Sequence, residues 1–317
     1  MLLFEQFGVV HTKGSSHGPS RIIRLVYDTP DYVQLARSAY AIWYKLEAES
    51  GEVLLRTIGG LDIGVPDALM LDSIRTTYEA LDIPFETLDR DEIVRRYPKF
   101  QLPEETIAYY QPDYGLLDAD RCGATMANLA RRHGAQVHEH EQVLQITPLS
   151  DGVEVLTNAG TYRVARLILS AGSWIGPLLE TPGNQLPLTA SKEMIAYFQP
   201  PDPEAYTPER FPIFIHRFPN TTTLGSGFSL FGHAGFKMIF DRTGPEVEPQ
   251  RPGPRGIAGS TRIADELCRQ RLAVVGDSGA RVGDMPLHHD PGRALRDRFS
   301  SRIPADRDCL ALFRSRF

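Results

Sequence analysis

The sequence has few cysteines and no long apolar run. Its three cysteines, Cys122, Cys268 and Cys309, have neither metal-ligand spacing nor a paired framework. They indicate a protein of the reducing cytoplasm, with Cys122 as a core residue. No apolar run approaches the roughly 18 residues that a membrane helix needs, and the N-terminus lacks the basic and then apolar order of a secretory signal. The sequence therefore predicts a cytoplasmic protein without a metal site or a membrane span.

An excess of positive charge is also absent. The formal net charge is −6, which gives no electrostatic reason to expect nucleic acid or an anionic membrane as a partner. The content of 42% hydrophobic and 23% charged residues is typical of a globular protein. With 317 residues, the chain is long enough for two domains.

The last part of the chain lacks three residue types altogether. Residues 251–317 contain 13 arginines and eight acidic residues but no lysine, tyrosine or tryptophan. All 12 tyrosines and both tryptophans precede this segment. The amino-acid composition therefore changes near Gln250, and this change requires an explanation.

Before that change, the hydrophobic pattern predicts alternating strands and helices. Residues 1–5 form an apolar strand that ends in a carboxylate, and residues 31–46 and 118–133 have helical periodicity. Residues 162–170 are predicted to form a strand that enters a tight turn at Ala171-Gly172. Such units favour an α/β nucleotide-binding layer. Strand-rich stretches between them favour a second domain with an antiparallel sheet.

The first strand ends at Glu5, where a carboxylate can accept hydrogen bonds from the ribose hydroxyls of a dinucleotide. A single strand-terminal glutamate is more often only solvated. The G-x-G-x-x-G motif that ordinarily precedes such a carboxylate is not in the sequence, which begins at Met1. We therefore expect the first strand and the pyrophosphate loop to be missing.

The most informative segment is His11-Thr12-Lys13-Gly14-Ser15-Ser16-His17-Gly18-Pro19-Ser20-Arg21-Ile22-Ile23-Arg24. Over these 14 positions the sequence resembles the monomeric sarcosine oxidase and N-methyltryptophan oxidase family of flavoenzymes. In that family an H-T-x-G-S-x-H-G-x-S/T-R-I-I-R segment wraps the isoalloxazine ring. A basic surface loop is the alternative interpretation.

The resemblance continues to about Gln250. The matching segments are Pro112-Asp113-Tyr114-Gly115-Leu116-Leu117, Leu169-Ser170-Ala171-Gly172-Ser173-Trp174, Ser191-Lys192-Glu193 with Tyr197-Phe198, Gly235-Phe236-Lys237 and Gly244-Pro245-Glu246-Val247. It implies a two-domain α/β (α+β) fold, in which an antiparallel-sheet substrate domain is inserted into an incomplete Rossmann-like FAD-binding domain. We assign residues 1–56 and 115–190 to the FAD-binding domain, residues 57–114 and 191–250 to the substrate domain, and residues 251–317 to an aberrant tail.

The resemblance also implies a reaction, namely oxidation of a secondary amine such as sarcosine by FAD and O2, giving an imine that hydrolyses, and hydrogen peroxide. Arg24 would bind the substrate carboxylate, His17 and Arg21 would lie against the ring, and Lys237 would place a cation near flavin N5. Without the surrounding motif, Lys237 would be interpreted as an exposed lysine on a strand. The implied cofactor contacts are Glu5, Ser15, Ser16, His17, Arg21, Val143, Ser170, Ala171, Gly172 and Trp174. The expected partners are a small amine and O2, and the expected state is a monomer.

Two positions depart from the family pattern. Residues 221–227 lack a Tyr-Gly-Phe-Pro-like stretch, and Asp241 stands where a histidine is common. The sequence therefore leaves the amine substrate open.

After Gln250, neither the segment with the flavin-linking cysteine nor the C-S-G-H-G-F-K-F loop of the family is present. Sliding the frame one nucleotide downstream from Met285 forces a cysteine codon and permits Cys-Leu-Tyr-Thr-Met-Thr-Pro-Asp. The same slide permits Ser-Gly-His-Gly-Phe from residues 313–317. We therefore hypothesise a frameshift near Gln250, with loss of the covalent flavin link and of a second cation for the substrate carboxylate.

Three functional hypotheses remain open on the sequence. The chain is an active flavin amine oxidase, a non-catalytic remnant of one (a pseudogene product or a faulty gene model), or a flavin-free binding module that reuses the substrate domain. A shifted frame predicts poor folding, weak FAD retention and negligible oxidase activity. Flavin absorbance and peroxide release separate the first hypothesis from the others.

Overall fold

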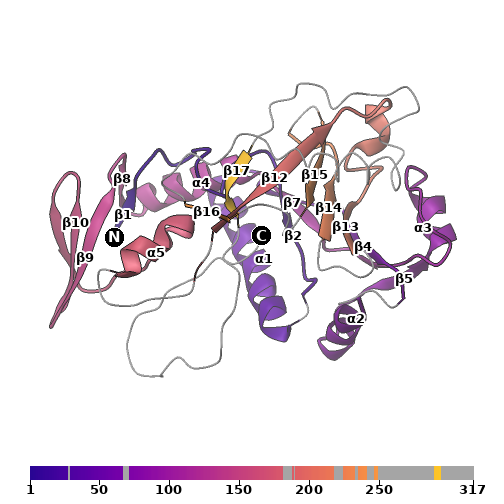
Figure 1. Cartoon of the computed structure of the whole chain (residues 1–317), viewed down its shortest axis with the longest axis horizontal. Coiled ribbons are helices and arrows are strands. Elements are labelled where there is room, and N and C mark those ends of the chain that lie inside the picture. The colour runs from indigo at the N-terminus through magenta and orange to yellow at the C-terminus, as the bar shows by residue number, and fades with distance from the viewer. Residues whose placement is uncertain are drawn as a thin grey trace.

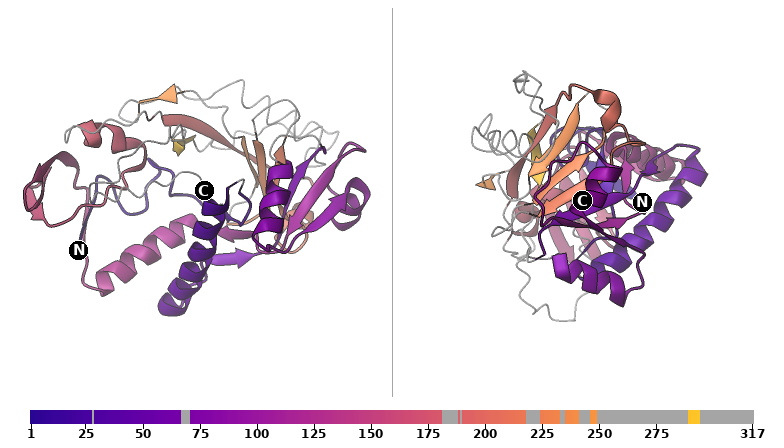
Figure 2. Two further views of the ribbon diagram at one scale, coloured as in Figure 1. Left: turned by 90° about the horizontal axis from the view of Figure 1, so that it is seen from below. Right: turned by 90° about the vertical axis from the view of Figure 1, so that its right-hand side faces the viewer.

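The computed structural model describes residues 1–27, 29–66, 71–180, 188, 190–217, 224–232, 235–240, 246–248 and 289–293. Figure 1 shows the large sheet toward one end of the molecule and two of the smaller sheets around the N-terminus at the other, with the long helix α1 (Pro30–Ser50) between them. Figure 2 shows α1 lying beside α4 (Ala119–Arg132). Strands and helices are thus mixed, as the sequence predicts.

The large sheet contains nine strands, which are β4 (Gly60–Gly64), β5 (Glu86–Asp89), β6 (Ile107–Gln111), β12 (Ala190–Phe198), β13 (Ile213–Arg217), β14 (Leu224–Phe228), β15 (Phe236–Phe240), β16 (Glu246–Val247) and β17 (His289–Arg293). Its order is β16-β12-β15-β14-β13-β4-β6-β5, with β17 also paired to β12. Every pair is antiparallel except β4 with β13, which is parallel. The sheet is therefore mixed rather than purely antiparallel, because the two stretches of chain that build it meet side by side in the same direction.

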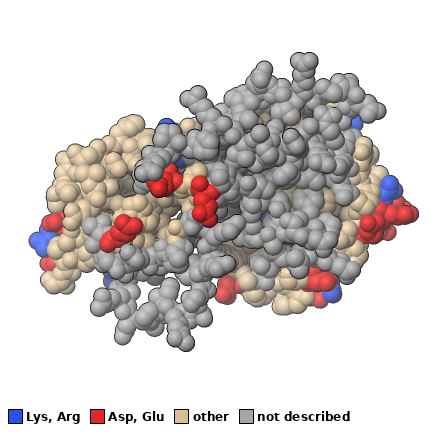
Figure 3. Space-filling model, viewed as in Figure 1, with Lys and Arg blue, Asp and Glu red and all other residues tan. Residues whose placement is uncertain are grey.

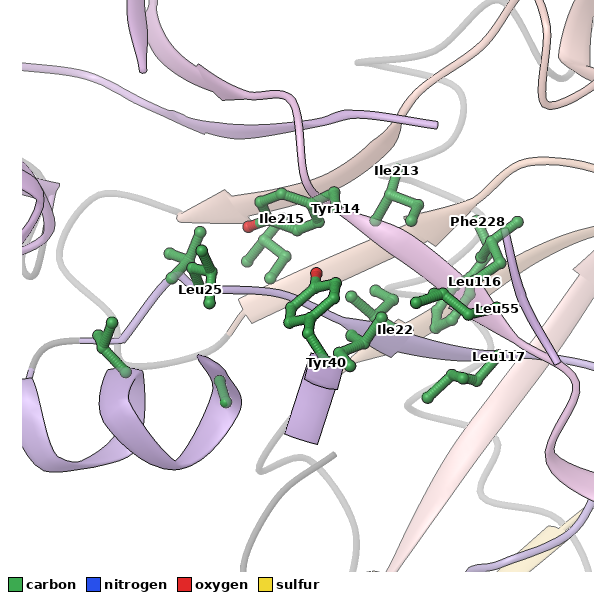
Figure 4. Close-up of a cluster of buried hydrophobic side chains, with 14 of the residues drawn as sticks. Ile22, Leu25, Tyr40, Leu55, Tyr114, Leu116, Leu117, Ile213, Ile215 and Phe228 are labelled. Atoms are coloured by element: carbon green, nitrogen blue, oxygen red, sulfur yellow. The ribbon is translucent and has the colours of Figure 1, made fainter. Parts of the chain in front are cut away.

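The two faces of this sheet bury different side chains, because successive residues of a strand point to opposite faces. On one face, Tyr197, Ile213 and Ile215 pack with Ile22 and Tyr40 from the N-terminal part of the chain. Figure 4 shows this core cluster, in which Tyr114 accompanies Ile213 and Ile215. The opposite face packs a separate aromatic cluster that includes Phe100, Tyr206, Phe211, Phe214 and Phe236. The first face packs against residues 11–24 (the motif) through Ile22 and Ile23.

Three smaller sheets form the rest of the described strands. β1 (Leu2–Glu5) pairs in parallel with β8 (Gln136–Glu139). β9 (Val143–Leu149), β10 (Gly152–Thr157) and β11 (Thr161–Val164) form an antiparallel meander. β7 (Gly115–Leu117) lies between β2 (Arg21–Ile23) and β3 (Leu55–Thr57). β2 places the end of the motif against the core.

The helices follow the expected start and stop signals. α1 has a proline in its first turn, and α4 is capped by Asp118, whose carboxylate accepts the Arg121 N–H. α3 (Arg90–Arg96) is capped in the same way by Asp89. The remaining helices are α2 (Leu71–Ala80), α5 (Ile175–Glu180) and the short 3-10 turns at Gly172–Trp174 and Pro203–Tyr206. The helices predicted over 31–46 and 118–133 are confirmed.

One predicted strand is shorter than expected. β11 ends at Val164, and residues 166–170 continue as irregular chain into the turn at Ala171. A strand needs a neighbour to accept its backbone hydrogen bonds, and no described strand pairs with residues 166–170. The apolar pattern of residues 166–170 therefore does not correspond to a strand, because no described strand pairs with them.

The predicted domain division stays a prediction, although the strands of the large sheet come mainly from the ranges that it assigns to the substrate domain. Apart from β17, residues 251–317 lie outside the described residues. None of the described helices is both long and apolar enough to cross a membrane. On the face seen in Figure 3, the described Lys and Arg side chains form no large basic patch.

Candidate functional site

Glu5 lies at the carboxyl end of β1, next to Glu139 at the same end of the parallel strand β8. Its Oε1 accepts the Phe7 N–H at 2.8 Å and lies 3.5 Å from Nε2 of His11. The Val9 N–H and then the Arg131 guanidinium lower the pKa of Glu139. The Glu139 carboxylate therefore already binds the chain that follows β1, at Val9. Ligands of α/β layers bind outside the carboxyl ends of parallel strands, and Glu5 occupies such a position.

Phe7, which precedes the motif, links His11 to the Ala171–Trp174 turn. The Phe7 ring lies edge-on to Trp174 with centroids 5.8 Å apart, and 4.9 Å from His11. The turn is closed by a hydrogen bond from the Trp174 N–H to the Ala171 carbonyl at 3.0 Å. Two segments that resemble flavin-binding segments are therefore brought together, although some 160 residues separate them.

The second part of the motif is held by its own arginine. Arg21 donates from Nη2 to the Ser15 carbonyl at 2.6 Å and from Nη1 to the Ser20 carbonyl at 2.9 Å. Gly18 has a φ of 95° and donates its N–H to Asp120 of α4 at 2.8 Å. His17, next to it, is buried. Arg21 thus shapes the loop on which His17 lies.

Lys237 joins the large sheet to this motif. Its side chain is only 2% exposed, and Nζ donates to the Ser20 carbonyl at 2.7 Å. Nζ also lies 3.3 Å from the Ser20 hydroxyl and 4.2 Å from the centroid of the Phe228 ring. A cation that is buried in this way needs strong acceptors or an aromatic face. The interpretation of Lys237 as an exposed strand lysine is therefore wrong.

The loop that follows β14 approaches the motif closely as well. Gly232 has a φ of 63°, and a Cβ added there would lie 2.8 Å from Cβ of Pro19. A larger residue would push the loop and the motif apart. The sheet and the motif therefore meet both through Lys237 and through this backbone approach.

Arg24 leaves β2 on the same side of the molecule. Its guanidinium carbon lies 5.3 Å from the centroid of the Tyr27 ring. Burial, followed by the Asp62 carboxylate, raises the pKa of Tyr78 and of Tyr114 well above the ordinary value, and Arg24 opposes this rise at both. Both hydroxyls are therefore protonated donors at neutral pH, within the electrostatic reach of Arg24.

The other predicted cofactor residues are spread along the edge of this region. Ser15 is half-buried and Ser16 exposed, while Ser170 and Gly172 are exposed and Ala171 and Trp174 half-buried. Val143 is half-buried at the start of β9. The structure brings together Glu5, Trp174, Arg21 and Lys237 through the motif, whereas no described contact joins Val143 to them. Their roles toward a cofactor stay predictions.

A buried ion pair on the large sheet was not predicted from the sequence. Asp62 of β4 pairs with Arg217 of β13, and the Tyr114 hydroxyl donates to Asp62 at 2.5 Å. One signal was available, namely a carboxylate within the otherwise apolar strand Gly60–Gly64, since a buried carboxylate requires a partner. The described residues contain no group of three or more His, Cys, Asp or Glu side chains that could hold a metal ion.

Comparison with known proteins gives a consistent set of relatives. The family model described as FAD dependent oxidoreductase matches residues 1–299. Monomeric sarcosine oxidase of Streptomyces avermitilis is 33% identical over 253 residues, which are 79% of this chain and 65% of that protein. N-methyl-L-tryptophan oxidase of Yersinia pestis is 30% identical over 211 residues, 66% of this chain and 56% of that protein.

A solved structure agrees with these matches. The open form of NikD, an unusual amino acid oxidase essential for nikkomycin biosynthesis, superposes with a TM-score of 0.76 at 26% identity, covering 87% of this chain and 72% of that one. The chain thus spans less than two thirds of the length of the curated relatives that it matches. The family-model match also extends past Gln250, where the sequence resemblance was expected to stop.

Proposed function

The chain belongs to the family of FAD-dependent oxidoreductases, and we propose that it oxidises the C–N bond of a secondary amine, sarcosine or another N-methyl amino acid, with O2 as electron acceptor. When bound, the flavin would take a hydride from the carbon beside the amine nitrogen and pass two electrons to O2, giving hydrogen peroxide. Water would hydrolyse the resulting imine to an aldehyde and the demethylated amino acid.

The described residues fit an FAD with its ribose near Glu5 and its ring near Lys237. Glu5 offers a carboxylate at the carboxyl end of a parallel strand. Lys237 offers a buried cation beside the backbone of the motif. Ser15, Ser16, His17 and Arg21 would border the ring, and Val143, Ser170, Ala171, Gly172 and Trp174 would border the remainder of the cofactor.

The observation that carries the proposal is the placement of Lys237. The protein buries this charge against Ser20, within the motif, instead of leaving it in water. A fixed cation there would stabilise negative charge that develops when O2 is reduced, without a cost of reorientation during the reaction. Arg24 would bind the substrate carboxylate, while Arg21 keeps the loop in shape.

The absence of a covalent flavin link forms part of the proposal. Cys122 is buried on α4, and Cys268 and Cys309 lie outside the described residues. The cofactor would then be held only by noncovalent contacts.

Kinetics of an Arg24→Lys variant test the substrate assignment. Lysine keeps the charge but loses the planar, two-pronged donor geometry, so we expect KM for N-methyl amino acids to rise about tenfold. The matched control is Arg56→Lys, because Arg56 forms an exposed ion pair with Glu209 and such pairs contribute little. An unchanged KM in the Arg24 variant would remove Arg24 from substrate binding.

A further inference from the structure

The Asp62–Arg217 pair is almost completely buried. Asp62 is 0% and Arg217 4% exposed, and their contact joins Nη1 of Arg217 to Oδ1 of Asp62. The second carboxylate oxygen, Oδ2, accepts the Tyr114 hydroxyl at 2.5 Å. Burying two charges carries a large desolvation cost, which their mutual attraction can fail to offset. The pair is therefore weak evidence for a contribution to stability.

The pair lies on the sheet face that carries Lys237. Asp62 is in register with Ile215, Ile215 with Ser226, and Ser226 with Ile239. Residues in register share a face, as do residues two apart on one strand. Arg217 is two positions from Ile215, and Lys237 is two positions from Ile239. Three strand spacings across the sheet and two residues along β15 therefore place Asp62 and Lys237 about 16 Å apart.

The row of residues in register with Asp62 contains a small residue, Ser226. Ser226 keeps partial exposure, whereas its neighbours Ile215 and Ile239 are buried. Ser226 lies in the 221–227 stretch that departs from the family pattern. Ser226 is therefore the smallest side chain among the residues in register with Asp62.

Two buried donors near Asp62 have no hydrogen-bond partner among the described residues. They are Nε of Arg217 and the hydroxyl of Tyr78, which is fully buried on α2. Tyr78 belongs to the same buried cluster as Tyr114, whose hydroxyl donates to Asp62, and the charges of Asp62 and Arg217 act on the Tyr78 hydroxyl. A buried donor without an acceptor is destabilising, and a bound acceptor would remove that cost.

We propose that Arg217, held by Asp62, and Tyr78 form a recognition subsite for a hydrogen-bond acceptor on the side chain of the amine substrate. This inference rests on the proposed oxidase function and narrows its substrate class. Because Asp62 neutralises Arg217, the subsite suits an uncharged acceptor such as a hydroxyl, while Arg24 remains for the substrate carboxylate. The preferred substrate is then a hydroxylated N-methyl amino acid rather than sarcosine.

A matched pair of ligands tests the subsite. Racemic N-methylserine and N-methylalanine differ by one hydroxyl group, and their dissociation constants can be measured without oxygen by titration calorimetry with the full chain carrying reduced FAD, which cannot oxidise them. We expect N-methylserine to bind about tenfold more tightly, since one hydrogen bond to a buried donor contributes about that factor. Equal dissociation constants, or no binding of either amine, would overturn the subsite.

Two variants separate recognition from a structural role. Tyr78→Phe removes a hydroxyl that no described group satisfies, so the variant should unfold at an equal or higher temperature while the ratio of the two dissociation constants falls toward one. Arg217→Lys keeps a cation beside Asp62 but removes the Nε donor, and the same ratio should fall. The control is Tyr44→Phe, at an exposed position of α1, which should keep the tenfold ratio. A ratio that stays tenfold in both variants would show that the cluster is only structural.

Failure of the subsite and failure of the proposed function give different results. Flavin absorbance and peroxide release from N-methylalanine report the oxidase function without the extra hydroxyl. If peroxide is released with equal KM from both amines, the oxidase proposal stands and the subsite is wrong. If the chain neither retains flavin nor releases peroxide from either amine, the oxidase proposal is wrong, and the subsite with it.

Discussion

At the residue scale, Lys237 shows how one side chain depends on two distant parts of the sequence. Its Nζ reaches Ser20, which lies 217 positions earlier in the chain, and packs against Phe228. The G-x-K motif indicated the residue but not its burial, because burial depends on the motif segment that covers it. Without that cover, a strand lysine would simply extend into water.

A Lys237→Met variant is expected to react slowly with O2. Methionine fills a similar volume but removes the cation, and loss of one fixed stabilising group typically costs about 10²–10³ in rate. Stopped-flow measurement of flavin reoxidation checks this directly. Lys99→Met, which removes a partly exposed ion pair with Asp202, is the control. Equal reoxidation rates in the Lys237 variant and the wild type would contradict the role in O2 reduction.

Interactions between residues far apart in the sequence could not be predicted from the sequence. Asp62 and Arg217 are separated by 155 positions, so the apolar strand around Asp62 indicates that a partner is needed but not which residue it is. The motif predicts roles for His17, Arg21 and Arg24, since its pattern is dense and local, and those roles stay predictions. The pairing of Asp62 with Arg217 could not be predicted, because it depends on strands that are far apart in the sequence.

At the element scale, the caps and periodicity of the helices were readable, but the sheet was only partly so. Asp118 before the apolar face of α4 marked its start, and the helix begins there. The parallel contact of β4 with β13 had no local signal, because strand direction depends on chain segments about 150 residues apart. The strand expected over 162–170 ends early for the same reason, since pairing requires a neighbour.

Two glycine substitutions should change the stability in opposite directions. At Gly227 of β14, a new Cβ would lie 2.0 Å from the Phe214 ring, and such overpacking typically costs about 1–3 kcal/mol. At Gly123 of α4, nothing lies within 4 Å of the new Cβ, so alanine should stabilise the helix by about 0.5–1 kcal/mol. Thermal unfolding of Gly227→Ala and Gly123→Ala measures both. A Gly227→Ala chain as stable as the wild type would show that β13 and β14 pack less tightly than described.

At the scale of the whole molecule, the fold class and the family could be predicted from the sequence because one dense motif and several shorter segments agree. The family model and the relatives confirm that prediction. The nature of residues 251–317 stays a hypothesis. Sequencing the gene across the Gln250 codon tests it: an extra or missing base is expected, and an unchanged reading frame would contradict the frameshift.

The mode of flavin attachment is also a property of the whole chain. If no cysteine links the cofactor, acid precipitation of the purified protein should release all flavin into the supernatant, because only noncovalent contacts are lost on unfolding. Absorbance of the supernatant and of the pellet measures the two fractions. Yellow colour retained in the washed pellet would show a covalent bond and would contradict the noncovalent assignment.

We propose that this chain oxidises N-methyl amino acids with FAD. The most direct measurement combines the visible absorbance of the purified chain with peroxide release after addition of N-methyl amino acids. We expect a flavin spectrum that bleaches when the amine is added without oxygen, and peroxide in step with amine consumption when oxygen is present. A folded chain that takes up no flavin and releases no peroxide would contradict the claim and would favour the non-catalytic remnant.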